Sequence, residues 1–146
     1  MTTPLAGWMA EATALVEALT PPDRTNYPFR EGDGKRKNLG QRSFHWEPPL
    51  RGPAILQNAT STHAEWEVDL VLLLKATGRS TTALAASVAN DVNLVTRAFE
   101  RAIQGGTWTT TGLWGVLMDD EVTAETLESG DVLLTFTFRV ETQETD

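Results

Sequence analysis

The sequence has no cysteine, few histidines and no long hydrophobic run, and these absences exclude several classes of protein. Without cysteine the chain can form neither a disulfide nor a cysteine-based zinc site. No apolar run approaches the roughly 20 residues that a membrane-spanning helix needs. The N-terminus lacks a basic segment followed by an apolar one, so we expect no signal peptide. The composition is otherwise that of a soluble globular protein, and we expect one domain, residues 1–146.

Basic residues are also scarce, and they are unevenly placed. The chain has 12 Lys and Arg against 20 Asp and Glu, for a net charge of −8. Residues 24–51 nevertheless sum to +4, so the remainder sums to −12. A basic segment on an acidic body either docks onto an acidic partner or a neighbouring copy, or is a solvated loop. Nucleic-acid binding is a further possibility, with Lys35–Lys37 as a basic loop and the rings of Phe44 and Trp46 as stacking surfaces for bases. The overall acidity argues against a dedicated nucleic-acid binder.

The longest regular pattern is the alternation of apolar and polar residues between Asp131 and Glu141. Because successive side chains of a strand point to opposite faces, this pattern predicts a half-buried β-strand. Residues 63–75 alternate in the same way and become apolar on both faces toward their end, as expected for a central strand. Three acidic side chains of this second strand share its polar face: Glu65, Glu67 and Asp69.

Two segments have helical periodicity. Residues 3–19 begin with Thr3, a candidate N-cap, and Pro4, which suits the first helical position. Residues 82–103 carry an apolar stripe, with a cap expected at Thr81 or Thr82 and with Asp91, Arg97 and Arg101 on the solvent-exposed side. Between the first helix and the first strand, residues 21–40 predict a long irregular basic loop.

Shorter segments complete the predicted fold. Residues 41–47, 112–118 and 122–127 are expected to be strands, 48–62 a connector, and the tail from Thr142 frayed. The element order predicts an α+β fold: a mixed or antiparallel β-sheet of about five strands with two α-helices packed on one face. The connection across residues 63–118 is long enough for a crossover. The other face of the sheet is left for water or a partner.

Patterns that would indicate catalysis or metal binding are weak. His45 and His63 could meet across paired strands as a base or a ligand pair, or be polar strand residues. The adjacent carboxylates of residues 119–121 could bind a cation, but neighbours on a turn rarely converge on one ion. Trp108 is either an exposed interface anchor or a lid over the core. We expect no catalytic residues, no metal and no cofactor; a small enzyme or ligand-binding domain built on the histidines is the less favoured alternative.

The order of the elements resembles the tail terminator proteins of long-tailed bacteriophages, also called tail completion or minor tail proteins. The resemblance spans nearly the whole chain and rests on element order, size and acidity, from the N-terminal helix to the alternating strand at 131–141. It implies a virion assembly protein that forms a homohexameric ring, caps the tail tube, stops its polymerisation and joins it to the neck of the capsid. Another phage neck, head–tail connector or adaptor protein is the alternative.

The resemblance also implies partners and a location. The partners are copies of the chain itself, the tail tube protein and a neck or head-completion protein, with DNA passing through the ring without sequence-specific binding. The location is the tail–neck junction of the virion, after assembly in the host cytoplasm. We hypothesise a head-to-tail contact of the basic segment with the acidic sheet face. The candidate residues for contact with a neighbouring subunit or the tube are Lys35, Arg36, Lys37, Arg42, Arg51, Glu65, Glu67, Asp69, Trp108 and Arg139.

Overall fold

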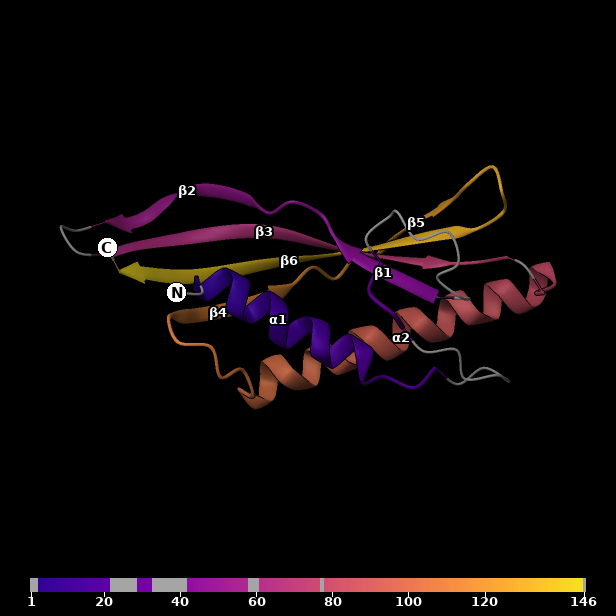
Figure 1. Cartoon of the computed structure of the whole chain (residues 1–146), viewed down its shortest axis with the longest axis horizontal. Helices are drawn as coiled ribbons and strands as arrows, with labels where there is room; N and C mark the ends of the chain where they lie inside the picture. Colours follow the sequence, from indigo (N-terminus) through magenta and orange to yellow (C-terminus); the bar gives the residue numbers. More distant parts are fainter. Residues whose placement is uncertain (1–2, 22–28, 33–41, 58–60, 77, 146) are drawn as a thin grey trace.

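The computed structural model describes residues 3–21, 29–32, 42–57, 61–76 and 78–145. Its elements follow in the order α1 (Pro4–Glu17), β1 (Arg42–Trp46), β2 (Leu50–Gln57), β3 (Ser61–Leu74), α2 (Thr81–Gly105), β4 (Leu113–Met118), β5 (Thr123–Thr126) and β6 (Val132–Thr145) (Figure 1). The predicted α+β fold is confirmed, with two helices beside one sheet. Neither helix is long and apolar enough to cross a membrane.

The sheet is built around β3 and β6, which pair antiparallel along their whole length, from Ser61↔Thr145 to Leu74↔Val132 (Figure 1). β1 and β2 share the outer edge of β3, each covering part of its length. β4 and β5 share the outer edge of β6 in the same way. Among the described residues, six strands thus form one sheet, and all pairings between these strands are antiparallel.

Two sequence-based expectations need correction at this level. The expected connector at 48–62 contains strand β2. The expected frayed tail from Thr142 instead continues β6, because β3 supplies a partner as far as Ser61. The predicted crossover is present: β3 and β4 each pair antiparallel with β6, so they run parallel to each other on either side of it and are joined through α2.

The two faces of the sheet differ as the alternation predicts. Even-numbered residues of β3 and β6 face the helices, and their apolar side chains from Val68 to Leu74 and from Val132 to Val140 are buried. Trp8 and Val16 of α1 and Val95 and Phe99 of α2 belong to the same core. Both apolar helix stripes therefore lie on one face of the sheet, as expected, which leaves the odd-numbered face uncovered by helices.

An aromatic cluster joins the helices to the sheet. The ring of Trp8 is fully buried and lies 5.4 Å from Phe138, 5.6 Å from Trp46 and 5.7 Å from Trp108, measured between ring centroids. Trp108 also lies 6.2 Å from Phe99. Trp108 was expected to be either an exposed interface anchor or a lid over the core. The structure shows the lid, because the loop after α2 folds back and places this ring on the core.

The helix ends follow local sequence with one difference. The Thr3 hydroxyl accepts a hydrogen bond from the Ala6 amide, and Pro4 begins α1, as predicted. The cap of α2 is Ser80, whose hydroxyl accepts from the Ala83 amide at 3.1 Å, one or two residues earlier than predicted. The helix ends at Gly106, whose φ of 61° is the left-handed conformation that glycine adopts at no steric cost.

Candidate assembly surface

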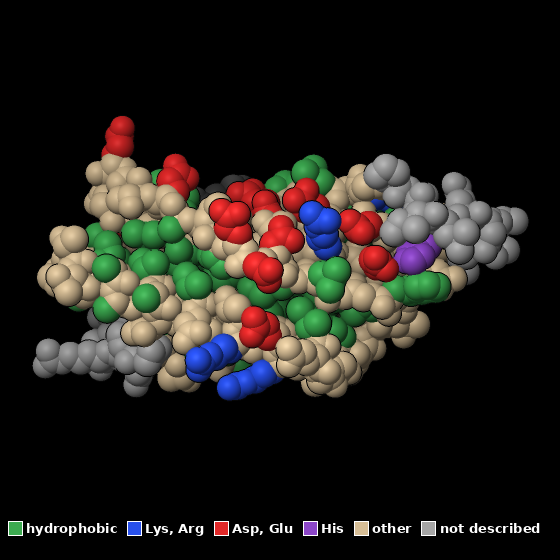
Figure 2. All heavy atoms as spheres, turned by 180° about the vertical axis from the view of Figure 1, so that it is seen from behind, with side chains coloured by type: hydrophobic (Ala, Val, Ile, Leu, Met, Phe, Trp, Pro, Cys, Tyr) green, Lys and Arg blue, Asp and Glu red, His purple; other side chains and the backbone are tan. Residues whose placement is uncertain are grey.

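The uncovered face of the sheet carries an array of carboxylates, which we call the acidic face: Glu65, Glu67 and Asp69 of β3 and Glu141 of β6. The three predicted acidic residues of β3 share this face, because they are two residues apart on one strand. The register adds a residue that sequence alone did not place beside them, since Glu65 pairs directly with Glu141. Acidic side chains gather at the centre of the molecule when it is seen from behind (Figure 2).

The carboxylates of the acidic face are only partly compensated within the chain. Glu65 and Glu141 lie directly opposite each other on β3 and β6. Like charges in this arrangement repel each other and destabilise the pairing of two strands. Asp69 accepts a hydrogen bond from the Thr137 hydroxyl at 2.7 Å, and Glu141 lies 3.5 Å from a ring nitrogen of His63. Within the described part of the chain, the side chains of Glu65 and Glu67 have no hydrogen bond or ion pair. They are available to a positively charged partner.

Arg139 lies among these carboxylates. It pairs across the strands with Glu67, and its Nε lies 3.8 Å from a carboxylate oxygen of Asp119. Because the Arg139 side chain is 56% exposed, this ion pair contributes little to stability. The acidic face keeps its negative sign because its four carboxylates outnumber this guanidinium.

Exposed hydrophobic side chains border the acidic face. Leu50 of β2 pairs with Glu67, and Leu117 of β4 pairs with Arg139, so one row across four strands runs Leu50, Glu67, Arg139, Leu117. Leu50 is 66% and Leu117 is 64% exposed. Leu50, Glu65, Glu67 and Arg139 also line a surface pocket of about 390 Å³. Apolar residues beside charged ones are typical of protein–protein contacts.

Sequence reasoning missed both leucines for different reasons. Leu50 falls in the segment expected to be a connector, so no face was assigned to it. Leu117 falls in a predicted strand, but its face depends on the pairing of β4 with β6 and on the irregularity between Leu113 and Gly115. The neighbouring Trp114 is 56% exposed; its indole donates a hydrogen bond to Gln143 at 2.9 Å, and its ring lies 4.2 Å from His63.

The structure places the other predicted interface residues in different surroundings. Lys35, Arg36 and Lys37 lie outside the described residues. Arg51 is exposed and lines the same pocket as Glu65, Glu67 and Arg139, and its guanidinium lies 5.8 Å from the centroid of the Trp66 ring. Trp108 packs on the core, so its ring is an unsuitable interface anchor.

Arg42 is not on the surface either, because it is 1% exposed. Its Nε donates to Asp91 Oδ2 at 2.7 Å and its Nη2 donates to Oδ1 at 3.0 Å. Asp91, which was expected on the wet side of the helix, is fully buried. This two-pronged ion pair ties β1 to α2 and makes Arg42 inaccessible to a neighbouring subunit.

A second polar cluster attaches the loop between α2 and β4 to α1. The Glu11 carboxylate accepts hydrogen bonds from the amide and hydroxyl of Thr109, at 2.8 and 2.7 Å, and from the amide and hydroxyl of Thr110. Burial acts to raise the pKa of Glu11, but these hydrogen bonds from Thr110 and Thr109 outweigh it and leave that pKa below its ordinary value.

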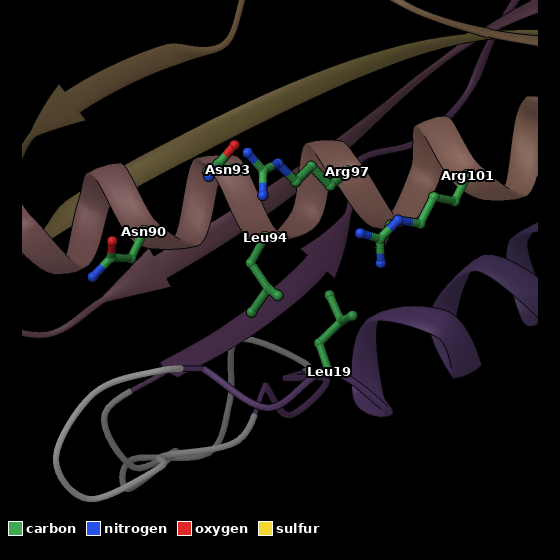
Figure 3. Close-up of a pocket in the computed structure, with 7 residues that line it drawn as sticks. Leu19, Asn90, Asn93, Leu94, Arg97 and Arg101 are labelled. Atoms are coloured by element: carbon green, nitrogen blue, oxygen red, sulfur yellow. The ribbon is translucent and has the colours of Figure 1, made fainter.

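The helix layer carries a positively charged groove of its own. A pocket of about 250 Å³ lies between the end of α1 and α2, lined by Leu19, Asn90, Asn93, Leu94, Arg97, Ala98 and Arg101 (Figure 3). Arg97 and Arg101 are exposed and extend in the same direction along α2. Within the described residues neither arginine has an ion pair. Sequence reasoning placed both only on the wet side of the helix.

The weak catalytic and metal-binding patterns are not brought together. His45 lies beside Val71 and His63 opposite Gln143, at different ends of β3, so the two histidines do not meet. Among the described residues, no group of three or more His, Asp and Glu side chains is arranged to hold a metal ion.

Comparison with known proteins identifies a fold and no family. No protein-family model and no curated protein sequence matches the chain. Among solved structures, a chain of the "Virion of native gene transfer agent (GTA) particle" has a similar fold, with a TM-score of 0.58 and 15% sequence identity. The match covers 97% of this chain and 92% of that chain. The chain thus shares the whole fold of a protein found in a virion particle.

Proposed function

We propose that this chain is a structural protein of a virion and that it acts in virion assembly and not as an enzyme. The observation that carries the proposal is the fold match over nearly the full length of both chains to a component of a virion particle. The charged, leucine-bordered acidic face gives independent support, because it provides a surface for assembly.

Within that role we propose that the chain is a tail terminator. Copies of it would form a ring, which the resemblance implies is a hexamer, and this ring would cap the tail tube, stop its polymerisation and join it to the neck. Two features support it: the element order of the tail terminator family and the separation of charge over the surface. The acidic face is one half of a head-to-tail subunit contact in this proposal, and a positively charged surface of the next copy is the other half. The basic segment with Lys35–Lys37 is the counterpart that the sequence suggests.

Electron microscopy of the purified chain, alone and mixed with tail tubes from the same particle, tests the function. We expect rings in the protein alone, density at one end of each tube, and tubes that no longer lengthen when tube protein is added. A ring that leaves tube growth unchanged but binds the portal or neck would favour the connector alternative. A monomer that neither binds tubes nor stops their growth would contradict the proposal.

A further inference from the structure

The two charged surfaces of the molecule lie on opposite sides. The acidic face belongs to the uncovered side of the sheet, whereas Arg97 and Arg101 belong to α2, which packs on the other side through Val95 and Phe99. Glu100, on the same helix, forms no ion pair with either arginine in the described structure and lines a different pocket, with Asp119 and Asp120. Each surface thus presents charges of one sign that the described residues leave without an ion pair.

We propose that the positively charged groove of α2 in one copy binds the acidic face of the next copy, with Arg97 and Arg101 pairing with Glu65 and Glu67. This inference rests on the proposed ring and identifies the contact that would close it. It differs from the contact suggested by the sequence, because both of its surfaces lie in helices and strands of the described structure. Asn90 and Asn93 beside the arginines supply further hydrogen-bond donors for carboxylates.

The spacing of the charges matches between the two surfaces. Arg97 and Arg101 are four residues apart on a helix, which separates them by about 6 Å along its axis. Glu65 and Glu67 are two residues apart on a strand, which separates them by about 6.6 Å. When α2 lies along β3, each guanidinium can therefore reach its own carboxylate, and arginine suits such pairs because it donates two parallel hydrogen bonds.

Apolar side chains accompany the charges on both sides. Leu94 and Leu19 line the groove next to the arginines (Figure 3). Leu50 lines the pocket of the acidic face next to the glutamates, and Leu117 ends the same row of the sheet. Burying these leucines on contact adds the hydrophobic contribution that exposed ion pairs lack.

The geometry favours repeated addition over a closed pair. The two surfaces consist of different residues and face opposite ways, so a contact between them is heterologous. Each added copy leaves one surface of each kind free until rotation brings the last copy back to the first. A ring of copies satisfies every groove and every acidic face, whereas an isolated dimer leaves one of each exposed.

Two charge-reversal variants test the contact by light scattering after size-exclusion chromatography. One carries Arg97→Glu with Arg101→Glu, and the other carries Glu65→Lys with Glu67→Lys. Each alone sets like charges against each other at every contact, so we expect the association constant to fall about a hundredfold or more. Mixed in equal amounts, the two variants should assemble again, because the negative groove of one meets the positive sheet face of the other and the reverse.

The conservative pair Arg97→Lys with Arg101→Lys keeps the charge and serves as the control, with circular dichroism to show that every variant is folded. The control should assemble nearly as the wild type does. If the wild type forms the oligomer and the groove variant still forms it unchanged, the α2 contact is overturned while the ring stands. The same holds if only reversal of Lys35, Arg36 and Lys37 dissociates the oligomer. A monomeric wild type overturns the contact and the ring together.

Discussion

At the scale of single residues, Arg42 and Asp91 form a buried ion pair between β1 and α2. Both side chains are almost fully buried, and two hydrogen bonds join them. A buried charge is tolerated only when a partner satisfies it, so each residue depends on the other. The pair explains why Arg42 is buried although its charge suggests a surface position.

We predict that Asp91→Ala lowers the free energy of unfolding by about 3–5 kcal/mol, because it leaves the Arg42 guanidinium buried without its counter-ion. Urea unfolding followed by circular dichroism measures the change. The double variant Arg42→Met with Asp91→Leu should recover most of the loss, since apolar side chains of similar size need no partner. Equal losses in the single and double variants would show that the ion pair itself supplies the stability.

At the scale of elements, the loop after α2 is held in place by its contacts with α1. Glu11 binds the amides and hydroxyls of Thr109 and Thr110, and Trp108 packs on Trp8. Gly112 ends the loop with a φ of 84°, and a Cβ there would lie 2.8 Å from the Gln143 carbonyl oxygen. These contacts position the start of β4, and with it Trp114 at the border of the acidic face.

We predict that Glu11→Gln lowers the free energy of unfolding by about 1 kcal/mol at pH 7, at the low end for charged hydrogen bonds because the carboxylate is only partly buried. The pKa of Glu11 is lowered by folding, so its contribution is present above the unfolded pKa of about 4.3 and is lost as pH falls through the folded pKa. The difference between wild type and variant should therefore shrink toward pH 3.

Unfolding in urea at pH 7 and pH 3 measures this difference. Glu17→Gln, at an exposed position of the same helix, is the matched control and should change stability little at either pH. A Glu11→Gln variant with the same deficit at both pH values would contradict the role assigned to the Glu11 carboxylate.

At the scale of the whole molecule, the separation of charge has a consequence for assembly in salt. The proposed contact sets exposed Arg97 and Arg101 against Glu67, which is exposed, and Glu65, which is partly buried. Ion pairs at such a surface are screened by dissolved ions. The screening length falls from about 10 Å at 0.1 M salt to about 3 Å at 1 M. The apolar contacts of the leucines at the same interface are strengthened by added salt or are unaffected by it.

We predict that the oligomer dissociates as sodium chloride is raised from about 0.1 M to about 1 M, with a smooth rise in its dissociation constant. Analytical ultracentrifugation at several salt concentrations measures this. The circular dichroism spectrum of the subunit should stay unchanged, because its core is apolar. An oligomer that becomes tighter with salt would indicate that apolar contacts dominate the interface.

The sequence by itself determined the features that depend on local periodicity. Alternation placed Glu65, Glu67 and Asp69 on one face and Leu70, Leu72 and Leu74 on the other, because side chains of a strand point to alternate faces. The caps and stripe of α1 followed from Thr3, Pro4 and its apolar spacing in the same way. These inferences needed no knowledge of neighbours, and the fold class followed from their order.

Only the tertiary structure decided which residues became neighbours. Periodicity assigns a residue to a face but not to a partner, because register and strand order depend on contacts between segments far apart in the chain. Thus Glu141 came to lie opposite Glu65, Arg42 found Asp91 inside the core, and β2 formed where proline and glycine suggested a connector. The groove of Arg97 and Arg101 likewise exists because α1 ends beside α2, a packing that no local pattern specifies.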